Sequence, residues 1–253
     1  MSTKSALDEL AAIPFHEAGA PQRARMLSRL ADTELSVALA GEPEGDDITL
    51  RIFTLDCGPV ALACDGEDRL AGFFDAPVAY AAMPGRVLAR LLLSDGVGLL
   101  VNPGHPSEML LDAPMLGWLA EALAAAPQPD LARLRLLAPA PEVVRALAGP
   151  LAERLGDMRG LIAGAALAGV AADEGDMVQS HLLLIQGAQE AQQPAIAKAL
   201  AEALAFLPPQ PGGVDISFAD ADSLPDPVLR FDLGAPEPLA QVTPRPKGPP
   251  ILR

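Results

Sequence analysis

The stretch Gly96-Val-Gly-Leu-Leu-Val-Asn-Pro-Gly104 decides the fold that the sequence predicts, because a short apolar run stops abruptly at Asn102. Helical patterns flank the run on both sides. Pro103 fixes φ for the first central position of a tight turn, and Gly104 accepts the positive φ of the second position. The stretch therefore predicts a buried strand between two helices, closed by a tight turn.

Prolines, capping side chains and apolar residues three or four positions apart predict the helices. A proline in the first turn suits a helix start because that position needs no N–H donor. The helix that follows Pro84 is expected to bury Val87, Leu88, Leu91 and Leu92. Pro150 falls inside an unbroken apolar stripe, which favours a kinked helix over a break. The predicted helices begin near these residues: Ser5, Pro21, Asp65, Pro84, Asp112, Pro141 and Pro194.

Apolar runs bounded by turn residues predict the strands. Residues 160–172 and 177–185 flank the turn signal Asp173-Glu-Gly-Asp176 and are interpreted as a hairpin. An Ala-rich helix over 160–172 remains the alternative. The other predicted strands cover these ranges: 36–40, 48–54, 59–64, 96–101, 134–137, 214–218 and 228–231.

Residues 126–130, Ala-Pro-Gln-Pro-Asp, form the clearest domain boundary because two prolines cannot continue a helix. We predict an α+β protein with two α/β-type domains, 1–126 and 131–242, each a small mixed sheet with packed helices. Residues 243–253 are rich in proline and favour an extended polyproline conformation over a core. They are either a loose tail or a docking segment for a proline-binding groove.

The charge balance excludes some classes of partner. The 253 residues carry 18 basic and 33 acidic side chains, a net charge of −15. Such a field repels nucleic acids and anionic membranes, so neither is an expected partner. The N-terminus has no secretory pattern, and the longest small-apolar run, 160–172, is too short to cross a bilayer. We expect a cytoplasmic protein.

The two cysteines, Cys57 and Cys64, are expected to be free thiols. On one extended path they lie roughly 23 Å apart, whereas a disulfide tolerates only about 7 Å between Cα atoms. Their spacing matches no metal or redox motif. Free thiols are typical of a reducing compartment.

Two segments resemble the SseB family, named for enhanced serine sensitivity protein B. Residues 61–73, ALACDGEDRLAGF, are similar to that family's strand, cap and helix, although Cys64 stands where the family usually has threonine. Residues 96–104 are similar to its apolar strand ending in Asn-Pro. The order helix, strand, strand, helix after Ala140 resembles the C-terminal domain of longer members. The resemblance implies an α+β fold and a bacterial cytoplasmic protein linked by name to serine sensitivity, and it implies little chemistry.

The loop that follows the apolar strand is a candidate ligand site. Loops at the carboxyl ends of strands are where α/β proteins place ligands. This loop combines an amide, an imidazole, a hydroxyl and a carboxylate. An ordinary turn remains the alternative, and Ser107 lacks the G-x-S-x-G pattern of hydrolase nucleophiles. The candidate residues are Asn102, Pro103, Gly104, His105, Ser107 and Glu108.

Metal or cofactor binding is not expected. His16, His105 and His181 have no i+4 partner and no accompanying cysteine pair. His181 is expected at a surface or strand edge. The pair Gly96-x-Gly98 precedes a strand, so it is not a dinucleotide fingerprint.

The helix predicted over 112–125 has two apolar faces. Three leucines form one stripe, and at about 100° per residue a second face lies well away from it. Its members are Met115, Trp118 and Ala122. One sheet covers one face only, so the second face predicts contact with the other domain or with another protein chain.

The sequence therefore predicts a non-catalytic binding or protein-interaction module. Its partner would be another protein or a second copy of the chain. The alternative function is a small-molecule binder or enzyme that uses the loop from Asn102 to Glu108.

Overall fold

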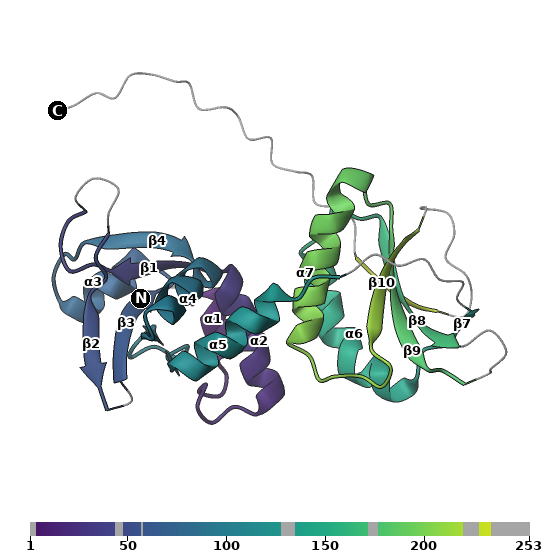
Figure 1. Cartoon of the computed structure of the whole chain (residues 1–253), viewed down its shortest axis with the longest axis horizontal. Coiled ribbons are helices and arrows are strands. Elements are labelled where there is room, and N and C mark those ends of the chain that lie inside the picture. Colours follow the sequence, from purple (N-terminus) through teal and green to yellow (C-terminus); the bar gives the residue numbers. More distant parts are fainter. Residues whose placement is uncertain are drawn as a thin grey trace, which may run out of the picture.

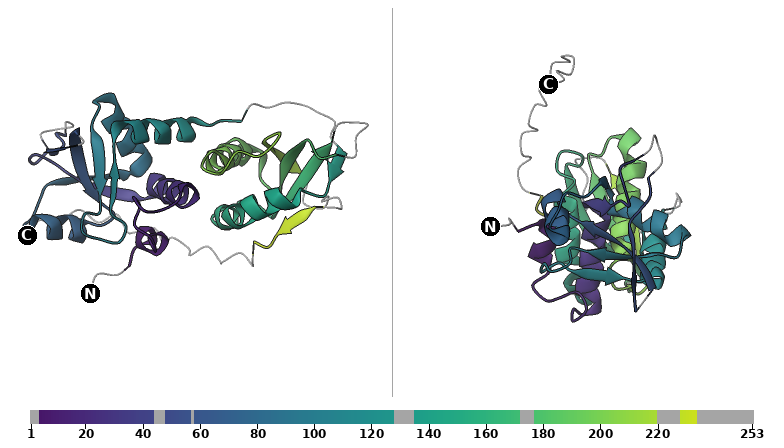
Figure 2. Two further views of the ribbon diagram at one scale, coloured as in Figure 1. Left: turned by 90° about the horizontal axis from the view of Figure 1, so that it is seen from below. Right: turned by 90° about the vertical axis from the view of Figure 1, so that its left-hand side faces the viewer.

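The computed structural model describes residues 4–43, 48–56, 58–127, 135–171, 177–219 and 228–233 (Figure 1). It contains two mixed sheets, each with helices packed on it, which confirms the predicted α+β class. Apart from α3, the helices of both regions lie between the two sheets (Figures 1 and 2). None of the helices in these ranges is both long and apolar enough to cross a membrane.

The first sheet has the strand order β4-β1-β3-β5-β6, and β2 pairs with β3. Its only parallel pair is β3 with β5, in a register that places Ala63 opposite Val101. The loops that follow these two strands therefore leave the same edge of the sheet. The strands are β1 Glu34–Ala38, β2 Ile52–Leu55, β3 Gly58–Cys64, β4 Tyr80–Pro84, β5 Gly98–Val101 and β6 Met109–Leu111.

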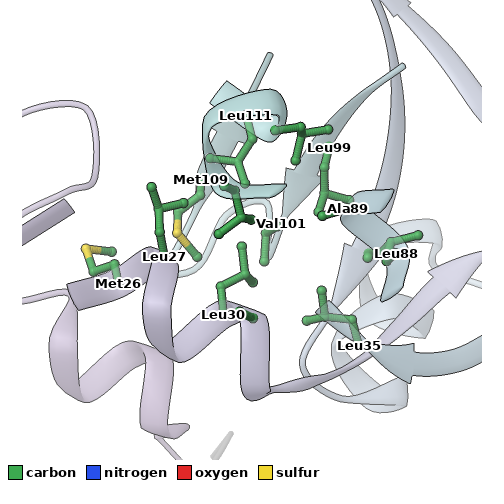
Figure 3. Close-up of a cluster of buried hydrophobic side chains, with 14 of the residues drawn as sticks. Met26, Leu27, Leu30, Leu35, Leu88, Ala89, Leu99, Val101, Met109 and Leu111 are labelled. Carbon is green, nitrogen blue, oxygen red and sulfur yellow. The ribbon is translucent and has the colours of Figure 1, made fainter. Parts of the chain in front are cut away.

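Four helices cover one face of this sheet, and their apolar stripes meet the strand side chains in one cluster (Figure 3). They are α1 Ala6–Leu10, α2 Ala20–Asp32, α4 Gly85–Ser94 and α5 Ala113–Ala124. Among the described residues, the opposite face carries one helix, α3 Glu67–Phe74, whose Leu70 packs with Leu62 and Cys64. The larger core therefore lies on the side that faces the second region.

The second sheet has the order β10-β9-β8-β11, with β7 paired to β8. Helices α6 Pro141–Gly156 and α7 Gln193–Ala205 pack on one face through Leu147, Leu151 and Leu200, and a short 3₁₀ turn, Glu190–Gln192, precedes α7. The strands are β7 Arg135–Leu137, β8 Gly164–Ala171, β9 Ser180–Gln186, β10 Val214–Ala219 and β11 Leu229–Phe231.

The hairpin prediction is confirmed, because β8 and β9 pair antiparallel from Gly164 opposite Gln186 to Val170 opposite Ser180. The alternative of a helix over 160–172 is wrong. Alanine favours helices, but here burial of the strand on both sheet faces outweighs that propensity. The α6 helix continues through Pro150, as its stripe indicates.

Three local predictions are wrong. Asp65 does not cap α3, since the N-cap is Gly66, which has no side chain to accept a capping hydrogen bond. Val87 and Leu91 are 49% and 39% exposed, because α4 turns only a narrow face, with Leu88 and Leu92, toward the sheet. His181 is not at a surface or strand edge. It is 2% exposed because β9 lies between β8 and β10.

Several predictions fall wholly or partly outside the described residues. These are Cys57, the turn at 173–176, much of the linker at 126–130 and the proline-rich residues 243–253. The domain boundaries stay a prediction.

We expect the free energy of unfolding to depend on pH through His181. Its Nε2 accepts a hydrogen bond from the Ala140 N–H at 3.2 Å. Within the described structure, its buried Nδ1 has no hydrogen-bond partner. Burial lowers the pKa of His181 below its ordinary value of 6.5, against the opposing charge of Glu142. The unfolded chain therefore binds the proton first, and the free energy of unfolding should fall as pH drops below about 6.5.

Urea unfolding at about pH 7.5 and about pH 5.5 measures this loss. The matched variant His181→Gln keeps an acceptor for Ala140 but does not titrate, so it should lose less stability over the same interval. An equal loss in the variant and the natural chain would show that His181 is not the source.

Candidate functional site

The candidate loop begins where β5 ends, beside the end of the parallel strand β3. Its first residue, Asn102, has a left-handed φ of 47°, and Gly104 has φ of 77°. The His105 N–H donates to the Asn102 carbonyl at 3.1 Å. This bond closes the tight turn that Pro103 and Gly104 predict.

The amide and the hydroxyl of the loop point inward. Asn102 and Ser107 are both completely buried. The Asn102 Oδ1 accepts from the Asp65 N–H at 2.9 Å, and its Nδ2 donates to the Ser107 Oγ at 2.9 Å. The Ser107 hydroxyl in turn donates to the Asp8 Oδ1 at 2.6 Å. These bonds join the loop to the end of β3 and to α1.

A buried arginine completes this network. The Arg69 guanidinium contacts both carboxylate oxygens of Asp8 and lies 3.1 Å from the Asp65 carboxylate. Burial raises the pKa of Asp8, but hydrogen bonds from Arg69 and Ser107 outweigh it and hold that pKa well below its usual range. Asp8 is therefore a charged partner of Arg69 that fixes α1 to the sheet.

The remaining loop residues do not join this network. His105 is half-buried, and the Glu108 Oε2 accepts from the Gly104 N–H at 2.6 Å. In the described part of the chain, no hydrogen bond joins the His105 imidazole to Ser107. The structure thus brings Asn102 and Ser107 together under the surface and leaves His105 outside.

Cys64, at the end of β3, is a buried free thiol. Burial, followed by the charge of Asp65, raises its pKa to about 11. A thiol reacts as its thiolate, so Cys64 should be inert in the folded protein.

The variant Cys57→Ser keeps Cys64 as the single thiol. Titration with Ellman's reagent should find no rapid reaction in the folded variant and one thiol per chain after unfolding in urea. Rapid reaction before unfolding would contradict this burial.

The α5 helix carries the second candidate surface. Asp112 caps it, its Oδ1 accepting from the Met115 N–H at 2.9 Å. Ala122 is buried, Met115 is half-buried, and Trp118 remains 42% exposed. The Trp118 ring meets the Phe206 ring edge-on, with ring centroids 5.5 Å apart.

Phe206 follows α7 of the second region, yet it is 5% exposed and packs in the core cluster of the first. Charged side chains surround this contact. Arg86 pairs with Asp32 of the first region and at 3.0 Å with Glu202 of the second. Arg25 and Glu153 pair at 2.7 Å. The second face of α5 therefore contacts the second region, but that contact leaves part of Trp118 uncovered.

An open groove of about 430 Å³ lies beside the uncovered part of Trp118, between the N-terminal ends of α2 and α5. We call it the Trp118 groove. Arg23 and Asp112 supply its two charged side chains. Its apolar lining comes from Phe15, Leu27, Pro114, Met115 and Trp118.

Sequence reasoning missed three residues that organise these surfaces: Asp8, Arg69 and Phe206. Asp8 and Arg69 are 61 positions apart, and no local pattern signals a pair at that separation. Phe206 follows an ordinary amphipathic stripe. The one feature of the sequence that distinguishes Phe206 from the residues of that stripe is its position just past the end of the helix.

Comparison with protein families finds that residues 6–118 match the SseB protein N-terminal domain. Residues 6–118 of the chain are therefore similar to the SseB N-terminal domain. The matched residues run from the start of α1 to Trp118, so they contain the Asp8–Arg69 network, the loop and every residue that lines the Trp118 groove. The match stops there, and the resemblance of the second region to an SseB-type C-terminal domain stays a prediction. Comparison with curated proteins and with solved structures found no match.

Proposed function

We propose that this protein is a non-catalytic cytoplasmic module that binds an extended polypeptide segment in the Trp118 groove. One observation carries the proposal: Trp118 stays 42% exposed at the rim of an apolar groove even though Phe206 packs against it. Tryptophan is enriched among residues that dominate binding energy, and methionine adapts to varied partners. An open apolar groove lined by such residues suits a peptide chain.

The loop from Asn102 to Glu108 supports the non-catalytic part of the proposal. A nucleophile needs access to substrate and a base within hydrogen-bond reach. Ser107 is fully buried, and its hydroxyl donates a hydrogen bond to Asp8. The low pKa of Asp8 makes its carboxylate a weak base. The buried polar side chains of the loop, Asn102 and Ser107, instead hold α1 and the ends of β3 and β5 together.

Selection of random linear peptides displayed on phage tests the proposal. A chain in which the four prolines of residues 243–253 are serines, so that its own proline-rich segment does not compete, should enrich binders. Met115→Arg in that chain should reduce their binding by roughly tenfold or more because it places a charge in the apolar lining. Met177→Arg is the matched control, since Met177 is 80% exposed in the second region. Failure to enrich any peptide, or equal binding by the Met115→Arg chain, would contradict the proposal.

A further inference from the structure

We infer that the segment which occupies the Trp118 groove is the chain's own residues 243–253, so that the protein covers its binding surface with its C-terminus. This inference rests on the proposed function and names the occupant of the same groove. It is argued from the composition of the segment, its charge and the length of chain that carries it.

The composition of the segment suits an aromatic groove. Residues 243–253 read TPRPKGPPILR and contain four prolines. Proline-rich segments dock in aromatic-lined grooves because their extended conformation is formed before binding and loses little entropy. In the Trp118 groove, Phe15 and Trp118 supply the aromatic rings, and Pro114 and Met115 complete the apolar wall.

The charge of the segment is opposite to that of the rest of the chain. Residues 243–253 contain three basic and no acidic side chains, whereas residues 1–242 contain 15 basic and all 33 acidic ones. At the groove itself, Asp112 attracts a basic segment and Arg23 opposes it. Glu121, exposed one helical turn beyond Trp118, adds a second carboxylate. The segment therefore fits with its basic residues toward α5.

The connecting chain can reach across a large part of a compact protein. Nine residues, 234–242, join the segment to Leu233, the last residue that the structure describes. Fully extended, they span on the order of 30 Å, against a radius of gyration of about 18 Å for a compact chain of 253 residues. A tethered segment also binds at an effective concentration in the millimolar range, so even weak contacts suffice to hold it.

The test uses Trp118, the only tryptophan, as the reporter. We compare the natural chain with a full-length chain in which the four prolines of 243–253 are serines, the tail-serine chain. The inference predicts that the tail-serine chain has red-shifted Trp118 emission and is quenched more strongly by acrylamide. The difference should persist when both chains are diluted, because the segment is covalently attached to its own groove.

A synthetic peptide of residues 243–253 provides the second measurement. Added to the tail-serine chain, it should restore the blue-shifted emission with a saturable dependence on concentration. The same chain carrying Met115→Arg should bind the peptide at least roughly tenfold more weakly. The same chain carrying Met177→Arg should bind it normally.

Three outcomes would overturn the inference. Identical emission and quenching of the natural and tail-serine chains would show that the segment does not cover Trp118. Loss of the difference on dilution would assign the groove to the tail of a second copy. If selected phage peptides bind the tail-serine chain in a Met115-dependent way while the 243–253 peptide does not, the proposed function stands and this inference fails.

Discussion

Replacing Arg69 with methionine is expected to lower the free energy of unfolding by about 3–5 kcal/mol. The substitution keeps most of the side-chain volume but removes the charge that faces Asp8 and Asp65. Both carboxylate side chains are only 3% exposed. Removing one partner of a buried ion pair destabilises the fold by more free energy than the intact pair contributes, because the remaining charges stay buried from water without a partner. Equilibrium unfolding in urea measures the effect.

Arg51→Met is the matched control for this prediction. Arg51 is exposed and lies over the ring of Phe74 at 4.9 Å, a cation–π contact worth about 0.5–1 kcal/mol. If Arg69→Met costs no more than Arg51→Met, the Asp8–Arg69 network does not hold α1 to the sheet as described. Asp8→Asn, which keeps an acceptor for Ser107, should be destabilising but less so than Arg69→Met.

Phe206→Ala is expected to lower the free energy of unfolding by about 3 kcal/mol or more. The ring is 5% exposed, belongs to the second region and packs in the core cluster of the first, so its removal leaves a cavity between the two. It also removes the edge-on contact with Trp118, so Trp118 emission in the folded variant should shift to the red.

Phe73→Ala serves as the matched control because Phe73 is 47% exposed on α3. We expect it to cost at most about 1 kcal/mol and to leave Trp118 emission unchanged. A cost for Phe206→Ala as small as that of Phe73→Ala, with unchanged emission, would show that Phe206 does not couple the two regions.

Local chemistry made much of the fold predictable. Ser5 and Asp112 accept hydrogen bonds from backbone N–H groups three residues ahead, as their positions before apolar stripes indicate. Pro21, Pro141 and Pro194 stand in the first turns of their helices. The turn after β5 forms because Pro103 and Gly104 suit the two central positions. In each case the deciding residues are neighbours in the chain.

Predictions from the sequence did not anticipate local structure that depends on contacts between residues far apart in the chain. Asp65 reads as an N-cap, but its carboxylate pairs with Arg69, four positions ahead, and its N–H donates to Asn102 once β3 and β5 lie side by side. Asn102 and Ser107 read as ligand-binding groups, and the fold turns both toward Asp8. His181 is buried by strand order, which no local pattern specifies. The two-sided α5 was recognisable, but its contact at Phe206 was not.

Photo-cross-linking from position 115 tests most directly the claim that the Trp118 groove is the binding surface of this protein. A photoreactive amino acid replaces Met115 in the full-length chain, and a second chain carries it at position 177. After irradiation, mass spectrometry locates the cross-linked residues. We predict adducts from position 115 to a polypeptide segment, with residues 243–253 of the same chain foremost, at much higher yield than from position 177. Yields from position 115 that do not exceed those from position 177 would contradict the account.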